Sequence, residues 1–236
     1  MPFSVSVILP VFNGEAFLLE ALESLAHQSR VPDEVLVIDD GSTDSSRAVA
    51  ERFARENPQL SVKVFNQGHV GVWAARNFGV SQAVGQFVAF QDADDRSTPH
   101  RFSNQAAMLE SNPELDLSFG MFEEFGNVRL KSGSEEQVDE ESLSKELLGI
   151  CPGVLMARRA ALLRIGPFET KWKLASFIEW YLRAKLLGAQ IATSPEVLLH
   201  RRIHENNSGI LHRDCIATEY SEVFRMHLKR VREAKN

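Results

Sequence analysis

Three carboxylates stand within residues 91–95 of this 236-residue chain, directly after an apolar run that ends at Phe90. In an extended backbone, the spacing of Asp92 and Asp94 places both side chains on the same side. Their repulsion is offset either by water, in an ordinary polar loop, or by a bound cation. Hard cations such as Mg²⁺ and Mn²⁺ prefer carboxylate oxygens and are often held together with the phosphates of a ligand. The spacing therefore indicates one metal and its nucleotide, with Asp95 pointing elsewhere, to orient the other two or to cap the next helix.

Two further polar clusters follow apolar runs: PVFNG, which begins at Pro10, and DDGSTDSS, which begins at Asp39. The Asp39 carboxylate could accept from a base N–H or a ribose hydroxyl, and Gly41 permits a tight turn with close approach of a ligand. Turn and cap chemistry is the preferred interpretation for Asp40 and Asp44. In an open parallel sheet, ligands bind at the carboxyl ends of the strands, so the three clusters are expected to line one edge.

The elements that must position these clusters alternate between strand and helix patterns through the first half of the chain. Strand patterns in SVSVILPVF, EVLVID, SVKVF and QFVAF are separated by helical spacing in EAFLLEALESLAHQ, RAVAERFAREN and VWAARNFGVSQAV. This alternation predicts an α/β fold with a parallel sheet and helices on both faces. The second half is less regular, with these expected elements: a helix capped near Ser97, a strand over 115–122, a helix over about 177–187, a strand over about 190–199 and a tail helix over about 214–232.

The composition limits the class of protein and its partners. A chain of this length with 44% hydrophobic residues can form one large domain. The formal net charge of -6 argues against DNA or RNA as partners. Cys151 and Cys215 lack metal-type spacing and fit the reduced thiols of a cytosolic protein. The start has no signal-peptide pattern and no stretch nears the length of a membrane span, so we expect a cytoplasmic protein with at most peripheral attachment to the inner face of the membrane.

Four stretches together resemble the family 2 inverting glycosyltransferases, which have the GT-A fold. They are SVILPVFNGEAFLLEALESLAHQS, VLVIDDGSTDSS, GHVGVWAARNFGVSQAVGQFVAFQDADD and FIEWYLRAKLLGAQIATSPEVLLHRRIHENNS. The resemblance runs over about residues 4–95 and resumes over about residues 153–208. Several motifs in the right order and spacing are far more specific than a D-x-D alone, which occurs by chance in many proteins.

The GT-A fold that the resemblance implies is a Rossmann-like, mostly parallel sheet flanked by helices. We expect this domain over residues 1–212, with a nucleotide-binding half over 1–96 and an acceptor-binding half over 97–212, followed by an amphipathic C-terminal helix over 213–236. The implied reaction transfers a sugar from a nucleoside-diphosphate sugar, with UDP or dTDP favoured, to an acceptor hydroxyl with inversion. Mn²⁺ or Mg²⁺ would assist, and the acceptor would be a glycan, a lipid-linked molecule or a small molecule in cell-surface polysaccharide biosynthesis.

The resemblance also implies roles for single residues. Asp92 matches the acid that contacts the nucleotide sugar, and Asp94 matches the acid that holds the divalent metal. Asp39 matches the acid that hydrogen-bonds the base. The other positions that match the donor site are the end of the first strand and a basic residue in AARN: Pro10, Val11 and Arg76.

The segment HRRIHENNS resembles the part of the family that closes over the diphosphate. Alternation places Arg202 and His204 on one side of the chain. We expect both to contact the donor diphosphate, with His204 also able to ligate the metal. Trp73 is interpreted equally as a platform for the base and as a core residue.

The acceptor hydroxyl needs a general base on the side of the sugar opposite the phosphates. Many members of the family supply this base from an acidic pair at the start of a late helix, where this chain has Ser176 and Phe177. Glu179 is the carboxylate left in that stretch, and we predict it as the catalytic base. The alternative is a first-turn acid that interacts with the helix dipole.

Two segments of the second half carry no catalytic prediction. Residues 126–146 are polar and acidic and are expected to form a solvated loop, with an acceptor lid as the functional alternative. The tail helix is expected to pack its Ile216, Tyr220, Phe224 and Leu228 face on the body or on a second subunit, so a homodimer stays open. The less favoured alternative is contact of its basic end with anionic membrane surfaces.

Three other functions compete with this interpretation. A nucleotidyltransferase would need a basic, Gly-rich triphosphate loop near the first strand, which PVFNGEAF does not supply. A receiver-type phospho-acceptor would place acids after its first strand, where this chain has Pro10. A degenerate member that binds nucleotide sugar or glycan without turnover stays open, because the acidic pair is missing.

Overall fold

A computed structural model describes residues 3–126, 128–129, 135–136 and 147–233. Most of the loop expected over residues 126–146, with its lid alternative, lies outside the described residues. Within the described ranges, no helix is both long and apolar enough to span a membrane.

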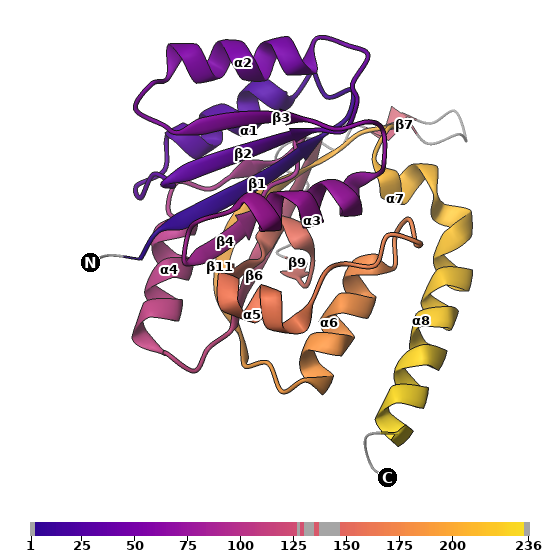
Figure 1. The fold of residues 1–236 in the computed structure, drawn as a ribbon. Coiled ribbons are helices and arrows are strands. Elements are labelled where there is room, and N and C mark those ends of the chain that lie inside the picture. The colour runs from indigo at the N-terminus through magenta and orange to yellow at the C-terminus, as the bar shows by residue number, and fades with distance from the viewer. Residues whose placement is uncertain (1–2, 127, 130–134, 137–146, 234–236) are drawn as a thin grey trace.

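The first half of the chain forms the parallel sheet that its sequence pattern predicts. Its strands are β1 (Val5–Val11), β2 (Glu34–Asp39), β3 (Val62–Asn66) and β4 (Phe87–Phe90). They lie in the order β3-β2-β1-β4, and every neighbouring pair is parallel. The helices between them, which Figure 1 shows against the sheet, are α1 (Leu18–Ala26), α2 (Ser46–Glu56) and α3 (Val72–Gln82). The carboxyl ends of the strands therefore meet at one edge.

The second half extends the sheet with strands of both directions. These strands are β5 (Arg96–Ser97), β6 (Leu117–Gly126), β9 (Leu147–Gly149), β10 (Met156–Arg158) and β11 (Ile191–Ile203). The order continues from β4 as β10-β6-β11-β5, with β9 beside β6. β10 is antiparallel to both of its neighbours, whereas β6 and β11 are parallel. A separate pair is formed by β7 (Val128–Arg129) and β8 (Glu135–Glu136).

The remaining helices cover the extended sheet and its margin. They are α4 (Arg101–Ser111), α5 (Arg159–Ile165), α6 (Ser176–Leu186), α7 (Ser208–Leu211) and α8 (Arg213–Glu233), with a 3-10 turn η1 (Pro152–Val154). The expected cap near Ser97 is wrong, because Ser97 pairs with β11 as part of β5 and α4 begins only at Arg101. The predicted boundaries at residues 96 and 212 stay a prediction.

Two hydrophobic cores sandwich the sheet, and β1 supplies both. Val7 and Leu9 face the core that includes side chains of α1, α2 and α4, and Ile8 faces the core that includes side chains of α3, α5 and α6. This alternation is the period of two expected for a strand that is covered on both faces. Gly79 lets α3 lie directly on Ile8, since a Cβ there would overlap the Ile8 side chain.

α8 lies along α6 at the side of the molecule (Figure 1). Val223 is buried there against Trp172, with Tyr220 partly buried beside it. Phe224 and Leu228 are 48% and 56% exposed, so the expected packing of these two side chains on the body is wrong, and their packing on a second subunit stays a prediction. α8 contacts α6 through the side that carries Val223, so Phe224 and Leu228 point outward.

Candidate donor-binding site

A buried polar network holds the turn that follows β4. Gln91 donates through Nε2 to the backbone oxygen of Asp95 at 2.7 Å and accepts at Oε1 from the Ser97 hydroxyl at 2.7 Å. The fully buried Arg101 donates to Gln91 Oε1 at 3.0 Å and to the Phe90 carbonyl at 2.8 Å. Burial lowers the pKa of Arg101 to about 10, which still leaves it charged at neutral pH. A cation below the turn thus offsets part of the charge of its carboxylates.

The three carboxylates of this turn point to different partners. Asp92 Oδ1 accepts from Arg76 Nη2 at 2.5 Å, and Asp94 Oδ2 accepts from Asn207 Nδ2 at 3.0 Å. Asp95 is buried and accepts the Arg202 backbone N–H at 2.8 Å, so it ties the turn to β11 and does not cap a helix. Burial, and then the charges of Asp94 and Asp92, raise the pKa of Asp95 well above its usual range. Asp92 and Asp94 are left as the partly exposed pair.

His204 reaches Asp94 from the end of β11. Its Nε2 lies 2.9 Å from Asp94 Oδ2, and its ring lies 4.7 Å from the Phe17 ring. The structure therefore brings together the two residues that were predicted as metal ligands, which are 110 positions apart in the chain. Within the part of the chain that is described, no group of three or more His, Cys, Asp or Glu side chains could hold a metal by itself.

The pair Asp94 and His204 still suits a metal that is shared with a ligand. A carboxylate and an imidazole are both ligands that Mn²⁺ accepts, and the remaining positions would be filled by phosphate oxygens and water. Asn207 holds the same carboxylate oxygen of Asp94 and so fixes its orientation. The donor set thus fits the predicted metal.

Arg202 is not free in this structure. Its Nη2 contacts Glu20 Oε2 of α1 at 2.5 Å, and its guanidinium carbon lies 4.8 Å from the Phe17 ring and 4.5 Å from the Phe125 ring. Its Nε donates to the Asp94 backbone carbonyl at 3.1 Å. The predicted contact of Arg202 with a diphosphate stays a prediction.

Arg76 approaches the same turn from α3. Its side chain is buried, its guanidinium carbon lies 4.6 Å from the Trp73 ring, and it reaches Asp92. Its Nε is buried with no hydrogen-bond partner among the described residues. Trp73 is 8% exposed, belongs to the core, and donates through Nε1 to the Lys173 carbonyl at 3.0 Å. Of the two interpretations of Trp73, the structure supports a core residue. Its ring also packs against the Arg76 guanidinium.

The turn after β2 lies at the same edge. Asp39 is buried and its Oδ1 accepts the Ser42 backbone N–H at 2.9 Å. Asp40 accepts the backbone N–H groups of Val70 and Gly71, each at 2.9 Å, so it joins the turn after β2 to the start of α3 rather than closing its own turn. At Gly41, φ is 79° and a Cβ would lie 3.0 Å from the His69 backbone nitrogen. Glycine is required there by both the conformation and the close approach.

Asp44 and the end of β1 complete this edge. Asp44 accepts the Ser46 backbone N–H at 2.9 Å, which confirms its role in the turn before α2. Pro10 and Val11 pair with Ile38 and Asp39 and are buried, so they form the floor beside Asp39.

An aromatic pair at this edge was missed by the sequence analysis. Phe12 follows β1 directly, is 46% exposed, and stacks on His69 with ring centroids 4.1 Å apart. The signal was present, since Phe12 lies within PVFNG, but a phenylalanine that continues an apolar run is hard to distinguish from a core residue. Only the end of the strand at Val11 places it outside the core.

Glu179 lies elsewhere, in the contact between α6 and α8. It is buried, its Oε1 accepts from Arg230 Nη1 at 2.5 Å, and its Oε2 accepts from Arg183 Nη2 at 3.0 Å. Burial by itself would raise the pKa of Glu179, but hydrogen bonds from the two arginines outweigh it and lower the pKa. Arg183 also donates to the Ile165 and Pro167 carbonyls. The catalytic role of Glu179 stays a prediction, and its surroundings are those of a structural ion cluster.

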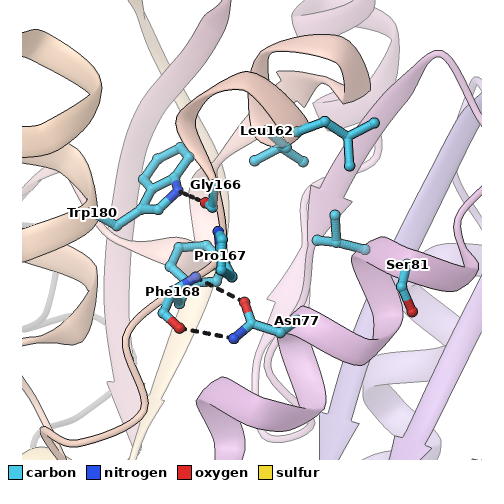
Figure 2. Close-up of a pocket in the computed structure, with 9 residues that line it drawn as sticks. Asn77, Ser81, Leu162, Gly166, Pro167, Phe168 and Trp180 are labelled. Carbon is cyan, nitrogen blue, oxygen red and sulfur yellow. Dashed lines mark hydrogen bonds between the residues drawn. The ribbon is translucent and has the colours of Figure 1, made fainter. Parts of the chain in front are cut away.

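A separate pocket lies between α3 and α5 and is largely apolar (Figure 2). Asn77 crosses it by exchanging two hydrogen bonds of 2.8 Å with the Phe168 backbone, and Trp180 Nε1 donates to the Gly166 carbonyl at 3.0 Å. Its lining contains no charged side chain and none of the predicted site residues. The pocket therefore offers nothing to hold a diphosphate.

The fold and the edge that carries Asp39, Asp92 and Asp94 define a GT-A type of glycosyltransferase domain. Residues 6–166 match the family model described as Glycosyl transferase family 2. This match covers more than half of the chain, so the chain belongs to glycosyltransferase family 2.

Two relatives agree with this assignment. The chain is 30% identical over 203 residues to the amylovoran biosynthesis glycosyltransferase AmsE of Erwinia amylovora, covering 84% of this chain and 75% of that one. It is 32% identical over 162 residues to EpsE of Bacillus subtilis, covering 66% of this chain but only 57% of that protein.

Two solved structures share the fold at low sequence identity. A fragment of Staphylococcus aureus TarS, solved with UDP, superposes with a TM-score of 0.70 at 23% identity, covering 95% of this chain and 64% of that one. A mannosyltransferase of Pyrobaculum calidifontis, solved with GDP-Man and Mn²⁺, gives 0.74 at 18% identity, covering 95% of this chain and 65% of that one. At such identities the likeness shows the GT-A fold alone.

Proposed function

We propose that this protein transfers a sugar from a nucleoside-diphosphate sugar to an acceptor hydroxyl, with inversion and with a divalent metal. The observation that carries the proposal is one turn at the carboxyl edge of the sheet. There Asp92 contacts Arg76, and two residues further on Asp94 contacts His204. In a family 2 domain, this arrangement supports neighbouring places for the nucleotide sugar and for the metal.

The donor would lie along the edge from β2 to β4. The base would rest against Phe12 and His69, with Asp39 below it as hydrogen-bond acceptor. Asp92 would contact the sugar end of the nucleotide. Arg76, held against Asp92 and Trp73, would keep that carboxylate in place and add positive charge near the phosphates.

Asp94 and His204 would hold Mn²⁺ or Mg²⁺. When bound, the metal supplies Lewis acidity to the diphosphate leaving group. Asn207 keeps the Asp94 carboxylate turned toward His204, so both ligand atoms are oriented before the donor arrives.

In the transfer step, the acceptor oxygen forms a bond to the anomeric carbon as the bond from that carbon to the diphosphate breaks. The acceptor proton must pass to a base on the opposite side of the sugar. For Glu179 to be this base, Arg230 would have to withdraw, since it now contacts the Glu179 carboxylate. The base assignment therefore depends on a movement of α8.

Structural neighbours support the donor class. TarS has been solved with UDP and with UDP-GlcNAc, and the Pyrobaculum calidifontis mannosyltransferase with GDP-Man and Mn²⁺. We favour a UDP- or dTDP-sugar for this chain. The name of AmsE, which refers to amylovoran biosynthesis, supports a glycan acceptor.

Calorimetric titration of the full chain tests the donor class. UDP, dTDP and GDP would each be titrated with Mn²⁺ and with EDTA, and we expect micromolar binding of UDP or dTDP that EDTA abolishes. Tighter binding of GDP would move the donor to the guanine class. A folded protein that binds none of the three would contradict the proposed donor site.

A second function is favoured by the surroundings of Glu179. Ser176 and Phe177 begin α6 without an acid, and both Glu179 oxygens are engaged by arginines. A protein with this arrangement could bind a nucleotide sugar without transferring it. Metal-dependent nucleotide binding without any release of nucleoside diphosphate from UDP- and dTDP-sugars, across a panel of glycan acceptors, would support this function over transfer.

A further inference from the structure

The outward face of α8 combines exposed apolar side chains with basic ones. Phe224 and Leu228, one helical turn apart, are 48% and 56% exposed. Arg225, Lys229 and Arg232 are exposed as well. Spacings of three and four residues place side chains on the same side of a helix. These five residues share one side: Phe224, Arg225, Leu228, Lys229 and Arg232. This side, formed by these five residues, is here called the outer face.

The charge of the outer face is opposite to that of the protein as a whole. The chain has a formal net charge of -6, yet residues 223–232 contain four Lys or Arg and no Asp or Glu, with the exposed Glu222 and Glu233 at the two ends of this stretch. One of the four, Arg230, is turned inward to Glu179. Lys229 reaches Glu233 only at 3.9 Å, with both side chains largely exposed. A local basic surface on an acidic protein indicates a partner that is anionic.

We propose that α8 docks this protein on an anionic membrane surface through the outer face. An interfacial helix of this kind places Phe and Leu side chains at the boundary between headgroups and acyl chains, and Lys and Arg side chains against anionic headgroups. The sequence analysis favoured packing of this face over contact with a membrane. The exposure of Phe224 and Leu228 favours the membrane, because no other part of the described chain covers these two side chains.

A second copy of the chain is a poorer partner for this face. A twofold contact through the outer face would bring the basic side chains of both copies, Arg225, Lys229 and Arg232, into one interface. Like charges that face each other across an interface are repulsive. A lipid surface with negative headgroups has the complementary sign.

Docking through α8 would also orient the rest of the molecule. Glu219 accepts the backbone N–H groups of Lys173, Leu174 and Ala175 at 2.9 to 3.0 Å, just before α6 begins. The Lys173 carbonyl in turn accepts from Trp73, which supports Arg76 at the donor edge. A membrane bound to α8 is thereby linked through packed contacts to the donor site. The docking itself is independent of the transfer reaction.

Vesicle co-sedimentation of the full chain tests this proposal. Vesicles of phosphatidylglycerol with phosphatidylcholine would be compared with phosphatidylcholine alone, in 0.1 M and in 0.5 M salt. The Debye length is about 2.2 times shorter at 0.5 M than at 0.1 M. We expect binding to the anionic vesicles only, weakened by salt. The variant R225Q/K229Q/R232Q should bind about 100-fold less, from roughly fivefold per basic side chain. The variant F224S/L228S should bind about 10-fold less.

A matched control is available on α2. Arg52 and Arg55 are exposed there, and R52Q/R55Q removes two charges without touching the outer face. This control should bind anionic vesicles as the unchanged protein does, and circular dichroism should show that every variant is folded. No binding to anionic vesicles, equal binding to neutral ones, or loss of binding in R52Q/R55Q would overturn the proposal. A dimer in light scattering that F224S/L228S dissolves would assign the face to a second copy.

Discussion

The donor edge and the contact between α6 and α8 are both built from carboxylates and arginines, yet they use these charges differently. Asp92 accepts from Arg76 through one oxygen, and its side chain is 35% exposed. Glu179 accepts from an arginine at each oxygen, and its side chain is 1% exposed. A carboxylate that is saturated and buried stabilises packing, whereas one that is half satisfied and open can take a ligand.

Asp94 resembles Asp92 in this respect, since its side chain is 27% exposed and its contacts to His204 and Asn207 fall on one oxygen. No contact to its other oxygen is found among the described residues. This difference in exposure and contacts supports the proposal that the turn after β4 binds the donor, whereas Glu179 joins α6 to α8.

The most severe test of this difference is Asp94→Ala. Residues that only orient a metal ligand typically contribute about 10- to 100-fold to metal affinity, so loss of the ligand itself should cost at least about 100-fold. We expect nucleotide binding in the presence of Mn²⁺ to fall by that factor in calorimetry. Glu56→Ala, which removes an exposed acid at the end of α2, is the control and should bind normally. Unchanged binding by Asp94→Ala would remove the metal site from this turn.

The opposite side of the comparison is tested by Glu179→Gln. Removing one partner of a buried ion pair costs about 3–5 kcal/mol, and the lower figure is expected because the Arg230 side chain is 34% exposed and can reach water. The free energy of unfolding, measured with urea, should fall by about 3 kcal/mol. Glu51→Gln, which breaks the exposed pair with Arg47, should cost less than about 0.5 kcal/mol. A Glu179→Gln protein of normal stability that binds donor but has lost transfer would identify a catalytic base instead.

A smaller effect is expected from Phe12→Ala at the rim of the donor edge. Stacking of a base on an aromatic side chain contributes about 1–3 kcal/mol, so nucleotide affinity should fall about 10-fold. Because Phe12 is 46% exposed, the stability of the fold should change little. Phe12→Tyr should restore the affinity measured by calorimetry, since it keeps the ring. Equal affinities for all three proteins would place the base elsewhere.

The smallest effect concerns pH and the docking of α8. The pKa of Glu179 is lowered by its two arginines against the effect of burial, and the pKa of Glu219 is lowered by three backbone N–H groups, again against burial. Groups with lowered pKa contribute stability above their ordinary pKa, near 4.5, and lose it as the pH falls through the folded-state value. We therefore expect α8 to loosen below pH 4.5, seen as a change in the near-UV circular dichroism of Trp172. The variant W172F is the reference, and a signal that is flat down to acid unfolding would contradict this coupling.

Much of the fold was predictable because its signals are local. The alternation of strand and helix patterns in the first half is set by neighbours two to four residues apart, and each predicted strand there is present. The D-x-D spacing of Asp92 and Asp94 and the turn chemistry of Asp44, which bonds Ser46 two residues further on, belong to the same class of short-range signal. The helix cap near Ser97 was mispredicted because Ser97 pairs with Leu199 of β11, a residue far away in the chain.

The sequence by itself determined the parallel sheet, the placement of acids at its carboxyl edge and the family, since each depends on residue types at short spacing. Only the tertiary structure decided which charges meet. Asp94 and His204 are 110 positions apart, Arg202 and Glu20 are 182 apart, and Glu179 and Arg230 are 51 apart. Likewise, α8 is amphipathic in more than one direction, and its contacts with α6 decided that Val223 faces inward while Phe224 and Leu228 face out. Such choices depend on packing between distant elements, which no local pattern encodes.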